Sequence, residues 1–249
     1  MSGGGLAITA CAGAVAVLGL SACESSQSES ARQRAAAQRA APEQGLRIAR
    51  ANSDVRVTAS TVLTDPEAKR SAAVVTLRNT SRRTQAALPL LFTLTDAEGK
   101  KVFSNDSAGA SADLTKVPSL APGATLTWVH DVIIDVAGAT GVKARIGVGT
   151  KTPRKPPRLR LSDVRLESDP VDGVTATGKV FNDSTVVQER LVIFAVARRG
   201  AKIVAAGRSV VPTLKPGRKG ARFTLFFIGN PRGAKLSLAV PPVSFEGAR

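Results

Sequence analysis

Cysteine, histidine and tyrosine are scarce in this sequence, and their scarcity excludes several kinds of site. The chain of 249 residues has two cysteines, one histidine and no tyrosine. Both cysteines, Cys11 and Cys23, precede the segments expected to form strands, so that later part has no disulfide bond, thiolate metal ligand or cysteine nucleophile. The carboxylates also lack the spacing of a calcium loop. We therefore expect no metal site and no cofactor.

The single histidine, His130, is a weak candidate for catalysis. It precedes Asp131 on an expected strand, and neighbouring residues of a strand point to opposite faces. The two side chains are thus badly placed to form a catalytic pair, and a polar residue at a strand end is the better interpretation. The sequence also has no phosphate-binding glycine loop. We expect the chain not to be an enzyme, and an enzyme with an unrecognised site is the alternative.

Aromatic residues make up only 4% of the chain. Nearly all of them lie in expected strands, where packing in a core is their ordinary role. Exposed stacking platforms for sugars or bases should therefore be few. Phe226 and Phe227 are neighbours on one expected strand, so the two rings should point to opposite faces, and one of them should be exposed at an interface.

An uncharged run from Leu6 to Leu20 opens the chain, and it is shorter than the ~20 residues that a membrane-spanning helix needs. Such a run is typical of a secretory signal peptide, although Met1 to Gly5 carries no basic residue. The run ends in Leu20, Ser21, Ala22 and Cys23, which resembles the lipobox of bacterial lipoprotein precursors. The resemblance implies cleavage before Cys23 and acylation of its thiol. We expect residues 1–22 to be a signal peptide and residues 23–50 a flexible, partly helical tether outside the membrane.

From Val55 onward, apolar residues alternate or form short runs broken by turn residues, a pattern typical of β-sandwiches. We expect an all-β fold with two immunoglobulin-like β-sandwich domains in tandem, at residues 51–149 and 159–249. Residues 150–158, rich in proline and basic residues, should form a stiff linker that holds the domains apart. The expected strands are Val55–Ser60, Ala72–Arg78, Leu88–Thr95, Lys100–Phe103, Thr125–Asp131, Val142–Val148, Leu159–Leu166, Val174–Phe181, Leu191–Ala197, Lys202–Ala206, Arg222–Ile228 and Lys235–Val240.

Three short landmarks recur in the same order in both domains, which indicates an internal repeat. Each pairs a segment of the first domain with one of the second. The pairs are Leu77–Ser81 with Val180–Ser184, Phe92–Leu94 with Phe194–Val196, and Ser119–Gly123 with Thr213–Gly217. The first domain has extra residues between Ser104 and Lys116, where we expect a longer loop.

The segment Phe92-Thr93-Leu94-Thr95-Asp96 resembles the strand motif of the FxLYD family, small β-sandwich domains of prokaryotic lipoproteins, with Thr in place of Tyr. The second copy, Phe194 to Gly200, keeps the Phe and a turn Gly but lacks the Tyr and the Asp. The resemblance covers most of both domains and implies no catalytic residues.

The net charge of +16 is concentrated in the second part of the chain, with +5 in residues 151–160 and +7 in residues 161–249. Such a field attracts anionic lipid headgroups or wall polymers; solvated surface charge without a partner is the alternative. Nucleic acid is not expected, because no recognition helix is evident and the leader predicts export. The candidate contacts are Lys151, Arg154, Lys155, Arg158, Arg160, Arg218, Lys219 and Arg222.

Taken together, the sequence predicts a membrane-anchored lipoprotein outside the cytoplasm that acts as a non-catalytic binding or scaffold module for an unidentified envelope protein. Binding of anionic lipid or wall polymer through the basic linker and the second domain is the alternative within the same class.

Overall fold

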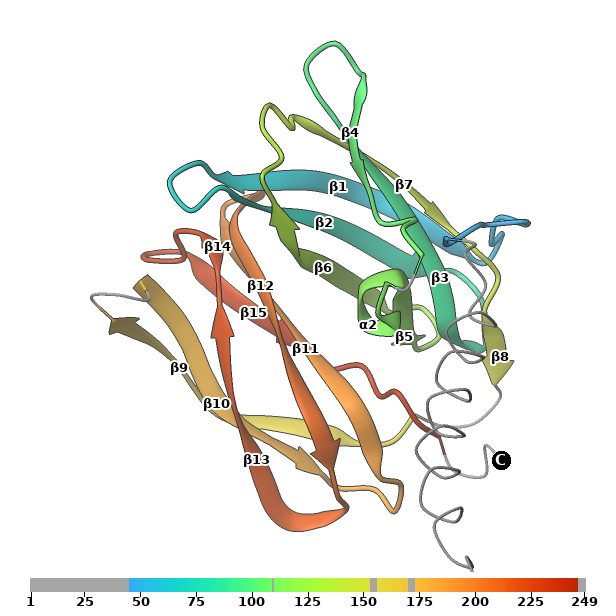
Figure 1. Ribbon diagram of the computed structural model, residues 1–249. Coiled ribbons are helices and arrows are strands. Elements are labelled where there is room, and N and C mark those ends of the chain that lie inside the picture. The colour runs from blue at the N-terminus through green and yellow to red at the C-terminus, as the bar shows by residue number, and fades with distance from the viewer. Residues whose placement is uncertain (1–44, 109, 153–155, 170–172, 246–249) are drawn as a thin grey trace, which may run out of the picture. The chain divides into compact units, whose positions relative to one another are not determined.

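The computed structural model describes residues 45–108, 110–152, 156–169 and 173–245 (Figure 1). The predicted lipobox from Leu20 to Cys23 and the candidate contacts Arg154 and Lys155 lie outside these ranges. The expected all-β fold is confirmed, since the described residues hold fifteen strands and one short helix. Within the described residues, no helix is long and apolar enough to cross a membrane.

The first half of the described chain forms two antiparallel sheets. One has the order β1-β2-β6; in the other, β3 pairs with β4, β5, β7 and β8. The elements are β1 (Val55–Asp65), β2 (Arg70–Asn79), β3 (Thr84–Thr95), β4 (Lys101–Ser104), α2 (Ala112–Thr115), β5 (Lys116–Leu120), β6 (Thr125–Ile134), β7 (Gly141–Ile146) and β8 (Thr150–Thr152).

The second half repeats this plan with two further antiparallel sheets, ordered β13-β10-β9 and β14-β12-β11-β15. Its elements are β9 (Leu159–Asp169), β10 (Gly173–Asn182), β11 (Gln188–Arg199), β12 (Lys202–Leu214), β13 (Gly217–Phe226), β14 (Ile228–Gly229) and β15 (Lys235–Ala239). All twelve predicted strands overlap observed ones; β5 and β8 were not predicted, and the predicted strand Arg222–Ile228 covers the end of β13 and the first residue of β14. Strand β8 occupies the first residues of the predicted linker.

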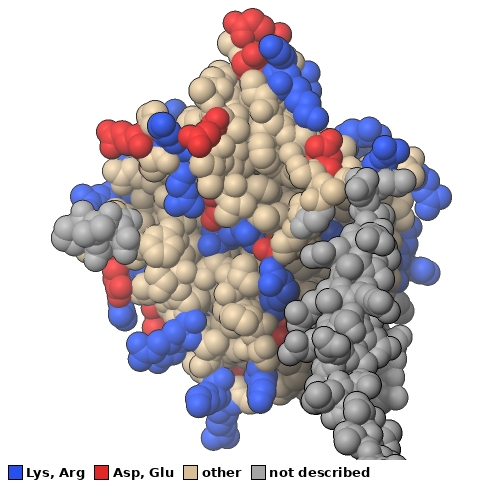
Figure 2. Space-filling view, viewed as in Figure 1, with Lys and Arg blue, Asp and Glu red and all other residues tan. Residues whose placement is uncertain are grey.

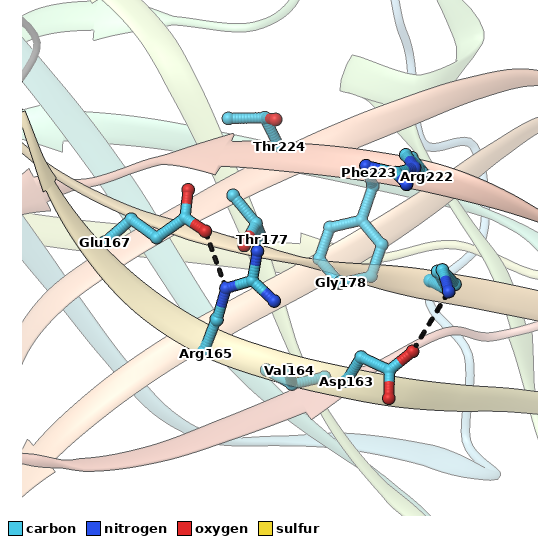
Figure 3. A pocket seen from close by; sticks show the side chains of 10 residues that line it. Asp163, Val164, Arg165, Glu167, Thr177, Gly178, Arg222, Phe223 and Thr224 are labelled. Atoms are coloured by element: carbon cyan, nitrogen blue, oxygen red, sulfur yellow. Dashed lines mark hydrogen bonds and ion pairs between the residues drawn. The ribbon is translucent and has the colours of Figure 1, made fainter.

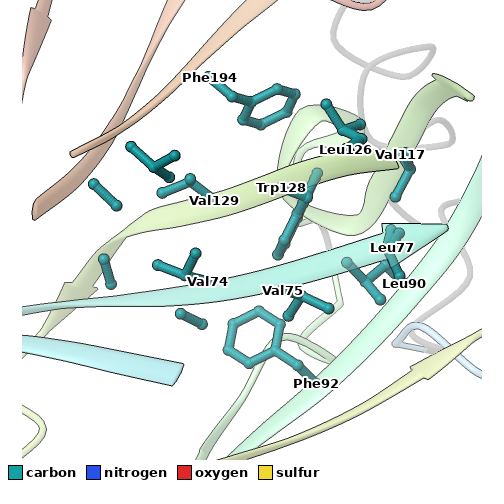
Figure 4. Packing of buried hydrophobic residues seen from close by; sticks show 14 of the residues in the cluster. Val74, Val75, Leu77, Leu90, Phe92, Val117, Leu126, Trp128, Val129 and Phe194 are labelled. Carbon is teal, nitrogen blue, oxygen red and sulfur yellow. The ribbon is translucent and has the colours of Figure 1, made fainter. Parts of the chain in front are cut away.

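The two halves pack against each other through their inner sheets, β1-β2-β6 and β14-β12-β11-β15. Val192, Phe194 and Val196 of β11 belong to the same buried cluster as the core of the first half. Figure 4 shows Phe194 and Val129 on one side of the β2 and β6 strands, with Trp128 and Phe92 on the other. The expectation that the linker holds the halves apart is therefore wrong, because each inner sheet has a second apolar face to bury.

The internal repeat is visible in hydrogen bonds at the ends of β2 and β10. The amide of Asn79 donates to the carbonyls of Arg83, Leu120 and Ala121 and accepts from the backbone and hydroxyl of Ser81. Asn182 makes the corresponding bonds with Val186, Leu214 and Ser184. The first predicted pair of landmarks thus has the same structural role in both halves. In each, the asparagine side chain closes a loop by forming hydrogen bonds with backbone carbonyl and N–H groups.

The second pair of landmarks is one residue out of register. Measured from the two asparagines, Gln85 corresponds to Gln188, and the positive φ of Ala87 to that of Arg190. Phe92 then corresponds to Ala195 rather than to Phe194. Phe92 points into the core of its own half, whereas Phe194 points to the opposite face, toward the first half. A shift of one residue in a strand changes the face of the side chain.

Candidate functional site

The described basic residues that were predicted to contact anions fall into two groups. Lys151 and Arg160 are neutralised by carboxylates: Lys151 lies 2.7 Å from Asp54 and Arg160 lies 3.4 Å from Asp183. The hydrogen bond from Lys151 holds the pKa of Asp54 below its usual value. The other group is exposed and forms no ion pair with any described residue; it consists of Arg158, Arg218, Lys219 and Arg222.

The sheet β13-β10-β9 brings most of these cations to one end. Asn182, the last residue of β10, pairs with Leu159 at the start of β9 and with Gly217 at the start of β13. Arg158, Arg218 and Lys219 therefore lie around the same sheet end, although they are distant in sequence. Lys and Arg side chains gather at the lower end of the second half in Figure 2, below the turn between β12 and β13.

Arg160 is fixed on the outer face of this sheet by an aromatic ring. Its guanidinium lies 4.3 Å from the centre of the Phe181 ring, the neighbour across the strands. The Phe181 ring in turn covers Gly220, where a Cβ would approach it to 2.8 Å. A side chain at position 220 would displace the ring, so Gly220 is required for this stack.

A groove of about 590 Å³ crosses the outer face of β9, β10 and β13 (Figure 3). Most of the lining side chains point away from the core formed by Ala176, Val180 and Leu225, and the Phe223 ring lies between that core and the groove, next to Gly178. Strand β9 bulges beside it, since Asp163 has a φ of 54° and the pairing with β10 shifts between Thr177 and Lys179. The polar residues of the groove are Asp163, Arg165, Glu167, Thr177, Lys179, Arg222 and Thr224.

Two ion pairs lie inside the groove. Arg165 donates from Nε to Glu167 at 2.6 Å, and Lys179 lies 3.3 Å from Asp163. The bond from Arg165 holds the pKa of the Glu167 carboxyl below its usual value. Both pairs are exposed, and exposed pairs stabilise a fold by only ~0 to 1 kcal/mol. A charged ligand can therefore replace one partner at small cost.

Arg222 has an unfavourable neighbour instead of a carboxylate. It stands directly opposite Lys179 on the paired strands β13 and β10, and like charges in that position destabilise a sheet. The side chain of Asp163 compensates Lys179 alone. An anion that lies between Lys179 and Arg222 would remove the repulsion.

A second set of charged residues lies buried between the two halves. Arg208 of β12 donates from Nε to Asp131 of β6 at 2.9 Å and from Nη1 to Asp113 of α2 at 2.6 Å. Its backbone nitrogen also donates to Asp131, at 3.0 Å. The side chain of Arg208 is only 9% exposed. The cluster thus joins both halves through one guanidinium.

Asp113 has a second basic partner, Arg190, whose Nη2 donates to the carboxylate at 2.6 Å. Burial alone would raise the pKa of Asp113, but hydrogen bonds from Ser111, Arg190 and Arg208 outweigh it and hold that pKa well below the usual range. The interaction with Asp113 raises the pKa of Arg190. Asp113 and Arg190 are therefore both charged at neutral pH.

The position of Asp113 depends on the segment that only the first half contains. In the second half, one continuous strand, β12, occupies the places taken by β4 and β5 in the first. Between β4 and β5, Asn105 bonds the carbonyls of Leu90 and Leu114 and the backbone nitrogen of Phe92, which holds the segment against β3. The predicted longer loop is thus the element that carries the ionic contact to the second half.

His130 is not a polar strand-end residue, and that expectation is wrong. It lies within β6, 4% exposed, with its ring packed against Phe92, Phe103 and Trp128. Burial, followed by the positive charge of Arg208, lowers the pKa of His130 to about 4, so the ring is neutral at neutral pH. Asp131 points to the other face of the strand, as the alternation of side chains requires.

The described residues contain no cluster of His, Cys, Asp or Glu able to hold a metal ion. Phe226 and Phe227 point to opposite faces, as predicted: Phe226 is 46% exposed, and Phe227 packs against the core of the second half.

A comparison with protein-family models and with curated protein sequences found no match to the chain.

Proposed function

We propose that the chain is an envelope lipoprotein, anchored to the membrane through an acylated Cys23, whose folded part is a non-catalytic binding or scaffold module. The order of an apolar run, small residues and a cysteine in residues 6–23 supports the anchor. Two acyl chains at one cysteine supply stable membrane attachment, because each buried methylene contributes ~0.8 kcal/mol. The basic, exposed sheet of the second half supports a role in binding at the cell surface.

The folded part fits two immunoglobulin-like modules of the FxLYD kind. The support is the repeated asparagine loop, the repeated Pro-Gly turn whose glycines, Gly123 and Gly217, both have positive φ, and the pairing of a three-stranded sheet with a larger one in each half. In such modules, binding depends on surfaces rather than on reactive groups. The burial of His130 within a core agrees with that reading.

The observation that carries the proposal is the group of exposed cations without carboxylate partners that consists of Arg158, next to the start of β9, and of Arg218, Lys219 and Arg222 on β13. Lys151 of β8 and Arg208 of β12 are matched by Asp54, Asp113 and Asp131, whereas exposed cations such as Arg78 of β2 and Arg145 of β7 also form no ion pair with a described residue. The group beside β13 is distinguished by its place at the groove, which Arg222 lines. Unmatched surface cations attract anionic partners over about one Debye length, ~8 Å at physiological salt. The binding role is therefore assigned to the second half, and an unidentified envelope protein or an anionic polymer is its partner.

Expression of the full chain in a bacterial host tests the anchor. Mass spectrometry should find a mature chain that begins at Cys23 and carries a diacylglyceryl group, and the protein should sediment with membranes. Cys23→Ser should remove the acyl group and the membrane association. Cys11→Ser is the matched control and should behave as the wild type. A membrane-free product that still begins at Met1 without a fatty acid would contradict the proposal.

A further inference from the structure

We propose that the groove across β9, β10 and β13 binds a linear acidic polysaccharide, that is, a sugar polymer that carries widely spaced carboxylate or similar anionic groups. This inference rests on the proposed binding role and names the ligand of its site. Three features of the groove support it: the charge pattern, the exposed polar side chains of Thr224, Arg165 and Glu167, and an exposed aromatic ring at one end.

The charge pattern selects a sparsely charged polymer. Arg222 and Lys179 face each other at one end of the groove, and the exposed Arg218 and Lys219 extend the positive field beyond it. The groove also contains Asp163 and Glu167. These two carboxylates would repel a polymer with a phosphate at every unit, such as a polyphosphate or a nucleic acid. A polymer whose anions are separated by neutral sugars can meet the cations and avoid the acids.

The middle of the groove offers hydrogen-bonding groups for sugar hydroxyls. Thr224 of β13 is exposed, and Arg165 and Glu167 of β9 are exposed across the groove from it; the Thr177 hydroxyl, opposite Thr224 on β10, is buried and forms the floor. Carboxylates accept hydrogen bonds from hydroxyl groups, and guanidinium groups donate them. Since the ion pair between Arg165 and Glu167 is exposed, both partners can contact a sugar as well as each other.

One residue pair beyond the threonines, Thr175 of β10 stands opposite Phe226 of β13. The Phe226 ring is half exposed and lies outside both buried clusters. An aromatic ring on a polar surface provides an apolar platform for the carbon-bearing face of a sugar. From Phe226 through Thr224 to Arg222, the exposed side chains of β13 thus change from aromatic to hydroxyl to cationic, which matches a sugar chain with an acidic substituent.

A flat lipid surface fits this site less well than a chain does. The groove is lined by side chains of three strands (Figure 3), so a chain that lies along it can contact all three, whereas a lipid surface would contact mainly the exposed cations at the sheet end. The cations around Arg218 and Lys219 are accessible to a plane, but Thr177 and Thr224 are not at that sheet end. Binding that needs the whole groove therefore distinguishes the polymer from the membrane.

The test measures binding of the full chain with Cys23→Ser, which lacks the acyl anchor and is purified without detergent, to hyaluronate, which has one carboxylate per two sugars. Neutral dextran, polyphosphate and vesicles of phosphatidylglycerol and phosphatidylcholine are the comparison probes. We expect hyaluronate to bind most tightly and the binding to weaken as salt rises. Tighter binding to polyphosphate or to the vesicles, or equal binding to neutral dextran, would overturn the inference.

Three variants locate the site. Arg222→Glu should weaken hyaluronate binding at least tenfold, and Phe226→Ala should weaken it several-fold. Arg145→Glu, on an exposed position of β7 in the first half, makes the same change of charge and should alter binding less than twofold. Equal losses for Arg222→Glu and Arg145→Glu would show that only the overall charge matters and would overturn the site.

Arg222→Glu places a carboxylate opposite Lys179, so it should not unfold the sheet. Thermal melting of each variant checks this point. The anchor and the groove are tested by different results. If the wild-type chain is acylated but no acidic sugar binds to the groove, only the groove proposal is refuted. A wild-type chain without a fatty acid that binds hyaluronate through Arg222 refutes only the location.

Discussion

Strands β3 and β11 occupy the same place in the two halves, yet their burial differs. From Leu88 to Leu94, buried residues of β3 alternate with half-buried ones. From Leu191 to Ala197, every residue of β11 is buried. The outer face of β3 meets solvent, whereas the corresponding face of β11 meets the first half. The two strands thus share their hydrogen-bonded pairing and one face packed in the core of their own half. Their second faces differ: that of β3 is partly exposed, and that of β11 is buried against the other half.

The largest expected effect comes from Arg208, on the inner face of β12. Arg208→Ala leaves Asp113 and Asp131 buried without their shared partner, which should lower the free energy of unfolding by about 3 to 5 kcal/mol. Urea denaturation of the full chain measures the loss. The control is Arg190→Ala, since Arg190 binds the same Asp113 but is 62% exposed, and its removal should cost about 1 kcal/mol or less. Similar losses for both variants would show that burial does not decide the effect.

The next effect separates β11 from β3 directly. Phe194→Ala should lower the free energy of unfolding by about 3 to 4 kcal/mol, because the ring is buried between the halves. Leu91→Ala, at the corresponding place on β3, should cost about 1 kcal/mol, because Leu91 is only half buried. The same denaturation experiment compares the two variants. A larger loss for Leu91→Ala would refute the assigned register of the repeat.

His130 should make stability depend on pH. Its pKa is about 4 in the folded chain and near 6.5 when exposed, so the unfolded chain binds the proton first as pH falls. The free energy of unfolding should then decrease by up to roughly 3 kcal/mol between pH 6.5 and pH 4. His130→Leu should abolish this decrease, because leucine does not bind a proton. Leucine should also fit the position, since Leu225 occupies the corresponding place on β13.

Denaturation at a series of pH values checks the His130 prediction. Asp113 does not affect this pH range. Because folding lowers its pKa from 3.8, the stability that its carboxylate adds is lost only as the pH falls below about 3.8. An unchanged slope in the His130→Leu variant would mean that other groups cause the pH dependence.

The smallest effects compare the two asparagine loops. Asn79→Ala and Asn182→Ala each leave buried carbonyls without donors, and each should cost about 1 to 3 kcal/mol. Asn79 serves three carbonyls and Asn182 serves two, so the loss for Asn79→Ala should be the greater by a few tenths of a kcal/mol. Thermal melting of both variants gives the order. The reverse order would argue that the two loops are not equivalent.

Local patterns in the sequence were sufficient to predict the strands and the turns. Alternation and turn residues located all twelve expected strands, and the asparagine and Pro-Gly landmarks located the repeat. The strand β5 was missed because it is short and contains Pro118, and β8 was missed because Thr150 to Thr152 adjoins a proline-rich segment. These misses affect edges of sheets, where the local signal is weakest.

The packing of the halves left a signal that the strand prediction did not use. Seven consecutive apolar residues from Leu191 to Ala197, and four from Ala72 to Val75, are typical of strands buried on both faces. The ionic cluster gave no such signal, because Asp113 and Arg208 are 95 positions apart and meet only through tertiary packing. The groove is also a product of register: Thr177, Thr224 and Arg165 become neighbours only when three strands pair.

The extra segment around α2 belongs to one copy of the repeat and meets a cation of the other copy. If the first halves of two chains packed together, Asp113 and Asp131 would face other carboxylates and no guanidinium. If two second halves packed together, Arg208 would face other guanidinium groups and no carboxylate. Only unlike halves match, and the short connection within one chain presents them to each other at a high effective concentration. Each molecule thus covers its own inner sheets, and these two surfaces are not free to join one chain to the next.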